Sequence, residues 1–89
     1  MPMFLVERSF AEQVRFGPEE ARVATSINAE VGISWLFSFL TADKKKTYCL
    51  YEAASAELIR EAARRAGIPA DVIIEVSEQR PEVILGNPG

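Results

Sequence analysis

The residues of this sequence best suited to chemistry are two glutamates and a cysteine that sit in or after apolar segments. Glu7 ends the segment 3–6, Glu52 ends a segment rich in tyrosine, and Cys49 lies inside that second segment. Two neighbouring carboxylates can share a proton or a cation, and one of them then has a raised pKa. A thiolate is a soft metal ligand. Glu7, Glu52 and Cys49 are therefore the candidate metal ligands.

Each of these residues also has a purely structural interpretation. A glutamate at a strand end commonly lies in solvent or pairs with an arginine such as Arg8. The chain has one cysteine and no histidine, so Cys49 has no disulfide partner and no activating imidazole, and it also fits a small core residue. Residues 44–46 are lysines without a glycine-rich phosphate nest, which is typical of a solvated loop. Both interpretations of Glu7 and Glu52 stay open.

Aromatic side chains form the second group of candidates. Trp35, Phe37 and Phe39 recur at every second position, which predicts that they share one face of a strand. Such a wall could line an apolar ligand pocket, or it could belong to the core or to a dimer interface. The hydroxyls of Tyr48 and Tyr51 could fix a ligand, although strands favour tyrosine in any case. Which tyrosine shares a face with Trp35 depends on the hairpin register.

These side chains must be positioned by strands, and four segments have the composition of strands. Residues 33–40 give the clearest pattern, with large apolar side chains on both faces. The other three predicted strands are residues 3–8, 47–53 and 72–76.

Two helices are predicted between these strands. The first begins at Pro18, a favoured first helical residue, and stops at Gly32. The second has Ser55 as its N-cap and closes at Gly67. Residues 9–12 fit a capping box and predict a short helical turn before the first helix.

The resulting order, β-α-β-β-α-β, predicts an α+β, ferredoxin-like fold with a four-stranded antiparallel sheet and two helices on one face. The first and third strands are then neighbours, which would place Glu7 and Glu52 in one patch. The bare face of the sheet would need a ligand or a second copy, so a homodimer is expected. We assign residues 1–78 to the domain and 79–89 to a C-terminal tail, whose apolar residues 83–85 could add an edge strand to a neighbouring chain.

Composition restricts the function classes. The 89 residues are 48% hydrophobic and 26% charged, with a net charge of −3, which indicates one globular domain without a basic surface for nucleic acid. No apolar run approaches the ~18 residues of a membrane span, and the N-terminus has no signal-peptide pattern. We therefore expect a cytoplasmic protein that binds neither nucleic acid nor membrane.

Residues 3–8, 35–39, 47–53 and 59–70 resemble a family of small bacterial domains. Its members are known either as domains of unknown function or as nickel-binding proteins, and the resemblance spans residues 3–76. It implies a ferredoxin-like fold, dimerisation through the open sheet face, and nickel as the ligand. Two positions where the family often has histidine hold Phe37 and Ala62 in this chain. The ligands that remain are Glu7, Glu52 and Cys49, with the tyrosines nearby.

Three functions follow from these observations. The first is a non-enzymatic, dimeric binding protein, with a divalent transition metal such as nickel as the first ligand to test. The second is a cofactor-free enzyme of the dimeric α+β-barrel kind, a monooxygenase or isomerase with an aromatic wall for an apolar substrate and Glu7 or Glu52 as general base. The third is a pure assembly module whose aromatic face only meets its twin.

Overall fold

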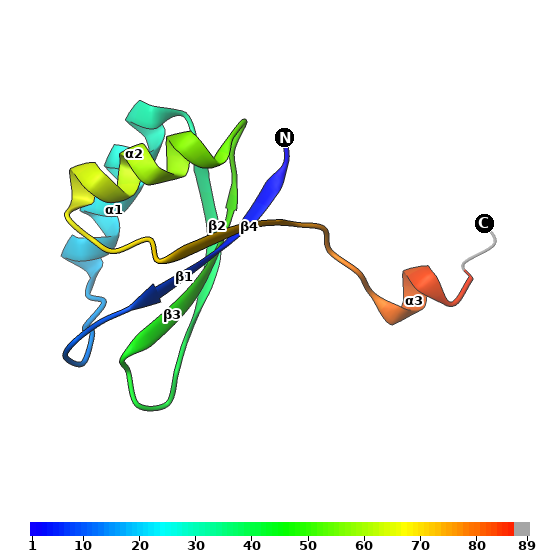
Figure 1. Cartoon of the computed structure of the whole chain (residues 1–89), viewed down its shortest axis with the longest axis horizontal. Helices are drawn as coiled ribbons and strands as arrows, with labels where there is room; N and C mark the ends of the chain where they lie inside the picture. The colour runs from blue at the N-terminus through cyan, green and yellow to red at the C-terminus, as the bar shows by residue number, and fades with distance from the viewer. Residues whose placement is uncertain (87–89) are drawn as a thin grey trace.

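The computed structural model describes residues 1–86 and contains one four-stranded sheet with two main helices on one side of it (Figure 1). The elements are β1 (Met3–Ser9), α1 (Pro18–Val31), β2 (Ser34–Leu40), β3 (Lys46–Glu52), α2 (Ala56–Ala66), β4 (Val72–Val76) and the single-turn α3 (Pro81–Ile84).

The strands lie in the order β2-β3-β1-β4, and every neighbouring pair is antiparallel. This arrangement confirms the predicted α+β, ferredoxin-like fold. The first and third strands in sequence are the two central strands, so their side chains have neighbours on both flanks.

The core lies between the sheet and the helices. We call this side of the sheet the covered face, and in the central strands it consists of Phe4, Val6, Arg8, Thr47, Cys49 and Tyr51, all of them buried. From the helix side, Ile59, Ala62 and Ala63 of α2 complete the packing. Small alanines on that face of α2 allow the helix to approach the sheet closely.

Both helices begin and end where the sequence predicts. Pro18 is the first residue of α1, and Gly32 ends it with φ +88°, a left-handed conformation that favours glycine. Gly67 closes α2 in the same way with φ +69°. Ser55 stands at the N-cap of α2, but its side chain makes no capping hydrogen bond.

The helical turn predicted for residues 9–12 is wrong. Ser9 is the last residue of β1, and the chain that follows runs beside the β2–β3 hairpin loop. The Phe10 N–H donates to the Lys45 carbonyl at 2.8 Å, and the Val14 N–H donates to the Lys44 carbonyl at 2.7 Å. These hydrogen bonds to a distant loop replace the local bonds that a helical turn would need.

The C-terminal segment also differs from its prediction. Residues 81–84 form the helical turn α3, with Pro81 at its start, rather than an edge strand. This segment stands apart from the sheet in Figure 1, and Val83, Ile84 and Leu85 are exposed. The predicted tail includes residues 87–89, which lie outside the described residues. Within residues 1–86, no helix has both the length and the apolarity needed to cross a bilayer.

Candidate functional site

The side of the sheet away from the helices, which we call the open face, carries an apolar row across all four strands. Phe37 of β2 pairs with Leu50 of β3, Leu50 pairs with Leu5 of β1, and Leu5 pairs with Ile74 of β4. Paired residues on neighbouring strands point to the same face, so these four side chains lie side by side. A second row runs parallel to it through Phe39, Tyr48, Glu7 and Val72.

Aromatic and aliphatic members of this face are open to solvent. Phe39 is 63% exposed and Ile74 is 51% exposed. The rings of Phe37 and Phe39 meet edge to face, with their centroids 5.5 Å apart. Contiguous apolar surface of this kind commonly marks an interaction site. The open face is therefore the candidate recognition surface.

Trp35 does not belong to this surface, contrary to the prediction that it shares a face with Phe37 and Phe39. The pairing of β2 with β3 is irregular between Trp35 and Phe37, which makes Leu36 an extra residue in the strand. Trp35 therefore pairs with Tyr51 and packs against the core. Its indole N–H donates to the Ser38 hydroxyl at 2.8 Å.

The two candidate tyrosines lie on opposite faces of β3. Tyr48 is on the open face opposite Glu7. Tyr51 is buried under the helices, and its hydroxyl oxygen accepts a hydrogen bond from Arg8 Nη2 at 3.0 Å. Burial raises the pKa of Tyr51, while the positive charge of Arg8 lowers it in part. Tyr51 is thus a neutral phenol at physiological pH and is not accessible from the open face.

Glu7 and Glu52 share the open face but lie at opposite ends of it. Glu7 pairs with Tyr48, whereas Glu52 pairs with Met3. This register separates the two glutamates by four residue steps, about 13 Å along the strands. The prediction that both carboxylates lie in one patch is therefore wrong for a single copy.

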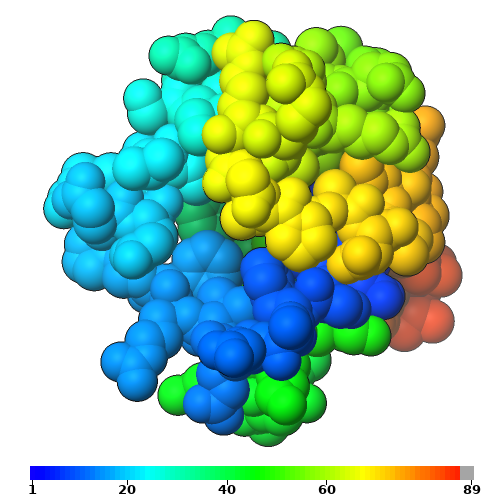
Figure 2. Space-filling view, turned by 60° about the vertical axis from the view of Figure 1, so that its left-hand side comes forward, coloured from blue at the N-terminus to red at the C-terminus, as the bar shows by residue number. Residues whose placement is uncertain are grey.

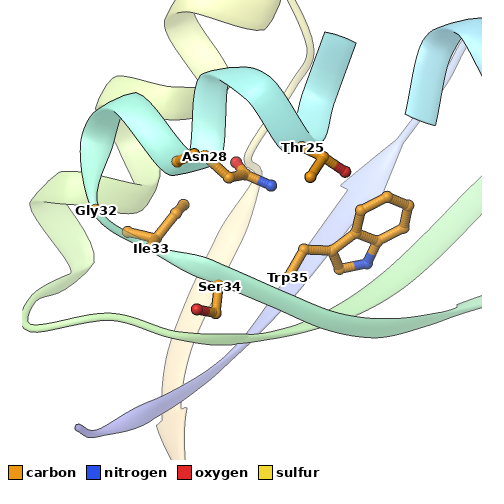
Figure 3. Close-up of a pocket in the computed structure, with 7 residues that line it drawn as sticks. Thr25, Asn28, Gly32, Ile33, Ser34 and Trp35 are labelled. Atoms are coloured by element: carbon orange, nitrogen blue, oxygen red, sulfur yellow. The ribbon is translucent and has the colours of Figure 1, made fainter. Parts of the chain in front are cut away.

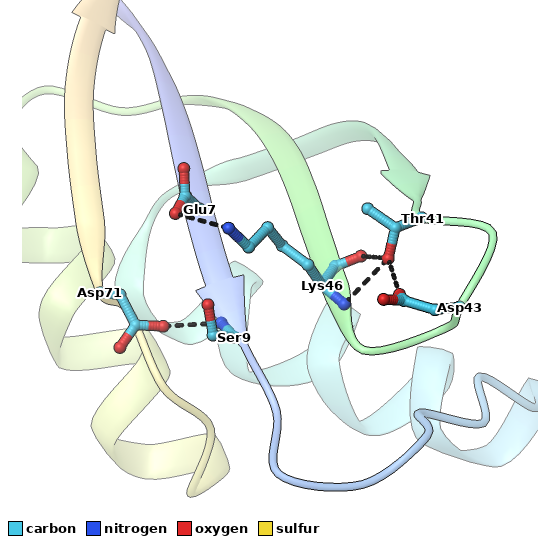
Figure 4. Close-up of polar contacts among 6 residues, drawn as sticks. All are labelled: Glu7, Ser9, Thr41, Asp43, Lys46 and Asp71. Carbon is cyan, nitrogen blue, oxygen red and sulfur yellow. Dashed lines mark hydrogen bonds and ion pairs between the residues drawn. The ribbon is translucent and has the colours of Figure 1, made fainter.

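Glu7 instead pairs with Lys46 (Figure 4). The Lys46 ammonium lies 3.2 Å from Glu7 Oε2, and this hydrogen bond raises the pKa of Lys46. Both side chains are about one-third exposed. An ion pair of this exposure is screened by solvent and contributes little to stability.

The other polar contacts in Figure 4 fasten the strand ends. Asp71 Oδ2 accepts a hydrogen bond from the Ser9 N–H at 2.6 Å. In the hairpin loop the Thr41 hydroxyl donates to Asp43 at 2.7 Å, and this bond lowers the pKa of Asp43. These carboxylates are engaged in holding loops, so they have a structural role.

Cys49 is buried on the covered face, and its sulfur lies 3.7 Å from the Thr47 hydroxyl. Because side chains alternate along a strand, Cys49 and Glu52 of β3 point to opposite sides of the sheet. Within residues 1–86, no three His, Cys, Asp or Glu side chains form a group that could hold a metal ion. One copy of the chain therefore does not bring together the predicted ligands Glu7, Glu52 and Cys49.

Cavities occur beside the helices. A cavity of about 470 Å³ lies between α1 and β2 and is shown in Figure 3. Thr25 and Asn28 of α1 form one side of it, and Trp35 forms the other. Neither Glu7 nor Glu52, the predicted general bases, lines this cavity or three further cavities among the described residues.

Sequence reasoning missed two buried polar residues on the covered side, Arg8 and Asn28. Arg8 follows Phe4 and Val6 at alternate positions of β1, so strand alternation alone places it on the same face. Asn28 lies four residues after Ala24 on the apolar stripe of α1. Its side-chain nitrogen is buried and has no hydrogen-bond partner within residues 1–86.

Comparisons with known proteins agree with this fold. The family model described as nickel responsive protein SCO4226-like matches residues 4–76. The crystal structure of SCO4226 from Streptomyces coelicolor A3(2) is 20% identical to this chain, with a TM-score of 0.75, and the match covers 88% of this chain and 99% of that one. No curated protein matches the chain. At this identity the structural likeness supports the fold alone.

Proposed function

We propose that this chain, which belongs to the SCO4226-like family of nickel responsive proteins, is a small binding protein that works as a homodimer joined through its open face. The observation that carries the proposal is the apolar row of Phe37, Leu50, Leu5 and Ile74, whose two end members are about half exposed while Leu50 and Leu5 are partly buried. A lone antiparallel sheet normally presents polar side chains on the face that helices leave bare. Here that face is apolar in its middle.

The layout of the open face resembles an interface between proteins. Its middle row carries no charge, and its charged side chains lie toward the ends of the strands, with Glu7 and Lys46 near one end and Glu52 at the other. Interfaces commonly have an apolar, aromatic centre and a polar rim. Two copies related by a two-fold axis would present the same row to each other, which makes the contact self-complementary.

Nickel does not fit one copy of the chain. Residues 1–86 contain no group of three potential ligands, and the whole chain has no histidine. We infer that nickel, where it binds, takes its ligands from two copies. Because Glu7 and Glu52 occupy opposite ends of the open face, a two-fold axis that runs across the strands through the Leu5–Leu50 row brings Glu7 of one copy over Met3 of the other, one strand away from Glu52. Carboxylates bind nickel more weakly than imidazole does, so we expect low affinity.

Sedimentation equilibrium tests the dimer with two matched variants. Ile74 on the open face and Val23 on α1 are both 51% exposed, so Ile74→Asp and Val23→Asp add the same charge to surfaces of equal exposure. We expect the wild type and Val23→Asp to be dimers. Ile74→Asp should weaken association by about 30-fold or more, because it buries a carboxylate in the apolar row of the proposed interface. A monomeric wild type, or equal dissociation of both variants, would overturn the proposal.

Calorimetric titration with nickel, combined with native mass spectrometry, tests the shared metal site. We expect the wild-type dimer to bind nickel and Glu7→Gln and Glu52→Gln each to lose it. Cys49→Ala should keep it, since Cys49 is buried on the other face. Binding by monomeric Ile74→Asp would contradict a shared site. A dimer that binds no nickel would remove the metal part of the proposal and leave the dimer part standing.

A further inference from the structure

A hollow on the helix side of the molecule leads toward the covered face. Figure 2 shows it between the chain that follows β1, helix α1 and the end of α2, with strand atoms visible at its bottom. Its outer part, which we call the outer pocket, has a volume of about 320 Å³. The wall of the outer pocket is mostly apolar and consists of Phe10, Val14, Phe16, Val23, Ala66 and Ile68.

A narrow inner slot adjoins the outer pocket, and the two share Ala24, Ala66 and Ile68 in their walls. The slot measures about 10 Å³, which is space for roughly one water-sized atom. Its polar lining residues are Arg8, Asn28 and Tyr51. The cavity therefore has an apolar entrance and a polar end.

Arg8 is a buried cation without a counter-charge. Arg8 is only 2% exposed, and none of the ion pairs within residues 1–86 includes it. The guanidinium donates one hydrogen bond to the Pro69 carbonyl and one to the Tyr51 hydroxyl oxygen, both neutral acceptors. Buried arginines are normally paired with a carboxylate. The guanidinium also lies over the Tyr51 ring, 5.8 Å from its centroid, but no carboxylate of residues 1–86 is paired with it.

Tyr51 and Asn28 add further donors at the same end. The Tyr51 oxygen accepts from Arg8, so its own O–H remains available to a ligand. Asn28, which lines both the slot and the cavity between α1 and β2, has a buried side-chain nitrogen with no partner within residues 1–86. An unpaired buried donor is costly, and an acceptor placed nearby removes that cost. A cation and two neutral donors together match a negatively charged acceptor.

We propose that this cavity binds a small apolar monocarboxylic acid, with one carboxylate oxygen in the slot against Arg8 and an aromatic or short aliphatic body in the outer pocket. The outer pocket is near the lower end of the range for small-molecule sites, about 300–1,000 Å³. A carboxylate oxygen is close to water in size, so the slot admits it. This site is independent of the open face and of any dimer formed there.

The rim of the outer pocket carries charged side chains of both signs. Glu19 and Glu20 line it together with Arg15. Glu20 accepts a hydrogen bond from the Gly17 N–H at 3.0 Å, and Glu19 is paired with Arg22 at 2.8 Å, so both remain at the start of α1. With Arg15 and Arg22 these two carboxylates leave the rim without a net charge, so recognition of an anion rests on Arg8 in the slot.

Titration with sodium benzoate, followed by ¹H–¹⁵N NMR spectra, tests the site, and uncharged benzamide serves as the matched probe. Benzoate should shift the signals of the Arg8 side chain, the Asn28 side-chain amide and Ala66, and leave Leu50 on the open face unchanged. Arg8→Met removes the charge at similar volume and should weaken benzoate binding by roughly 10–100-fold. Arg60→Met removes an equal charge from α2, where Arg60 is paired with Glu57 and lines neither the slot nor the outer pocket, and it should change benzoate affinity less than about threefold.

Several outcomes would overturn this site. They are wild-type protein that binds no benzoate, shifts confined to the open face, and equal benzoate affinity in Arg8→Met and the wild type. Benzamide should bind Arg8→Met and the wild type alike, since it carries no charge. Should Arg8→Met fail to fold, Ala66→Leu keeps the cation and fills the junction of slot and pocket. Retained benzoate binding in a folded Ala66→Leu would equally contradict the proposal.

Discussion

The two faces of the sheet are built from the same strands but have different environments. On the covered face, Val6 and Cys49 are 0% and 3% exposed beneath the helices. On the open face, Phe39 and Ile74 are more than half exposed although both are large and apolar. Alternation along each strand supplies apolar side chains to both sides, while the two main helices cover one side only. This difference is the reason that we propose association of two copies through the open face.

The two faces also differ in whether their charged side chains are paired. The covered face holds Arg8, buried and without a carboxylate partner in residues 1–86. On the open face, Glu7 is already paired with Lys46. The two faces are therefore proposed to bind different partners. The open face would bind a second apolar surface, and the slot beside Arg8 would bind an anion.

Truncating one isoleucine on each face gives the largest expected contrast. Ile59→Ala empties a site that is fully buried under the covered face and should lower the free energy of unfolding by about 2–5 kcal/mol. Ile74→Ala on the open face should cost less than about 1 kcal/mol at protein concentrations where the chain is monomeric. Urea unfolding measures both values. Equal losses would mean that the open face is packed as tightly as the core.

High pH should weaken the covered face through Tyr51. Burial raises the pKa of Tyr51 above its usual value of 10.0, so the folded state holds the phenol proton more tightly than the unfolded chain does. The stability gained in this way is complete below about pH 10 and is lost as the pH rises through the folded pKa. Urea unfolding at increasing alkaline pH should show a steeper fall for the wild type than for Tyr51→Phe. Part of the fall remains in the variant, since the pKa of Lys46 is also raised. Identical slopes would contradict this role of Tyr51.

The smallest expected effect concerns the hydrogen bond between Trp35 and Ser38, which tests whether Trp35 of β2 lies on the covered face. Ser38→Ala removes the acceptor of the Trp35 indole N–H and should cost about 1 kcal/mol while changing the fluorescence of the chain's single tryptophan. Ser34→Ala, at an exposed serine of the same strand, should do neither. Trp35 emission should also stay the same when Ile74→Asp separates the copies. A spectral change on separation would place Trp35 on the open face after all.

Much of the fold follows from local signals in the sequence. Pro18, Gly32 and Gly67 bound the two main helices as predicted, because proline and glycine act through the backbone at their own positions. The strand predicted at residues 72–76 has the bounds of β4. The β-α-β-β-α-β order then leaves few ways to form the sheet.

The candidate site was less predictable because it depends on register and on distant contacts. The extra residue Leu36 moves Trp35 to the covered face, and nothing in the alternating pattern marks that irregularity. The pairing of β1 with β3 places Glu7 and Glu52 at opposite ends of their strands, which strand adjacency alone does not reveal. The charge of Arg8 predicts a solvent-facing strand end, whereas its alternation with Phe4 and Val6 indicates the buried, covered face.

Intermolecular NOEs between labelled and unlabelled copies in one NMR sample would test the open face most directly. If two copies meet through this face, the methyl groups of Leu5, Leu50 and Ile74 should show such contacts with the partner copy, and the methyl groups of Ile59 should show none. The absence of contacts at Leu5, Leu50 and Ile74, or contacts confined to the helix side, would contradict the account.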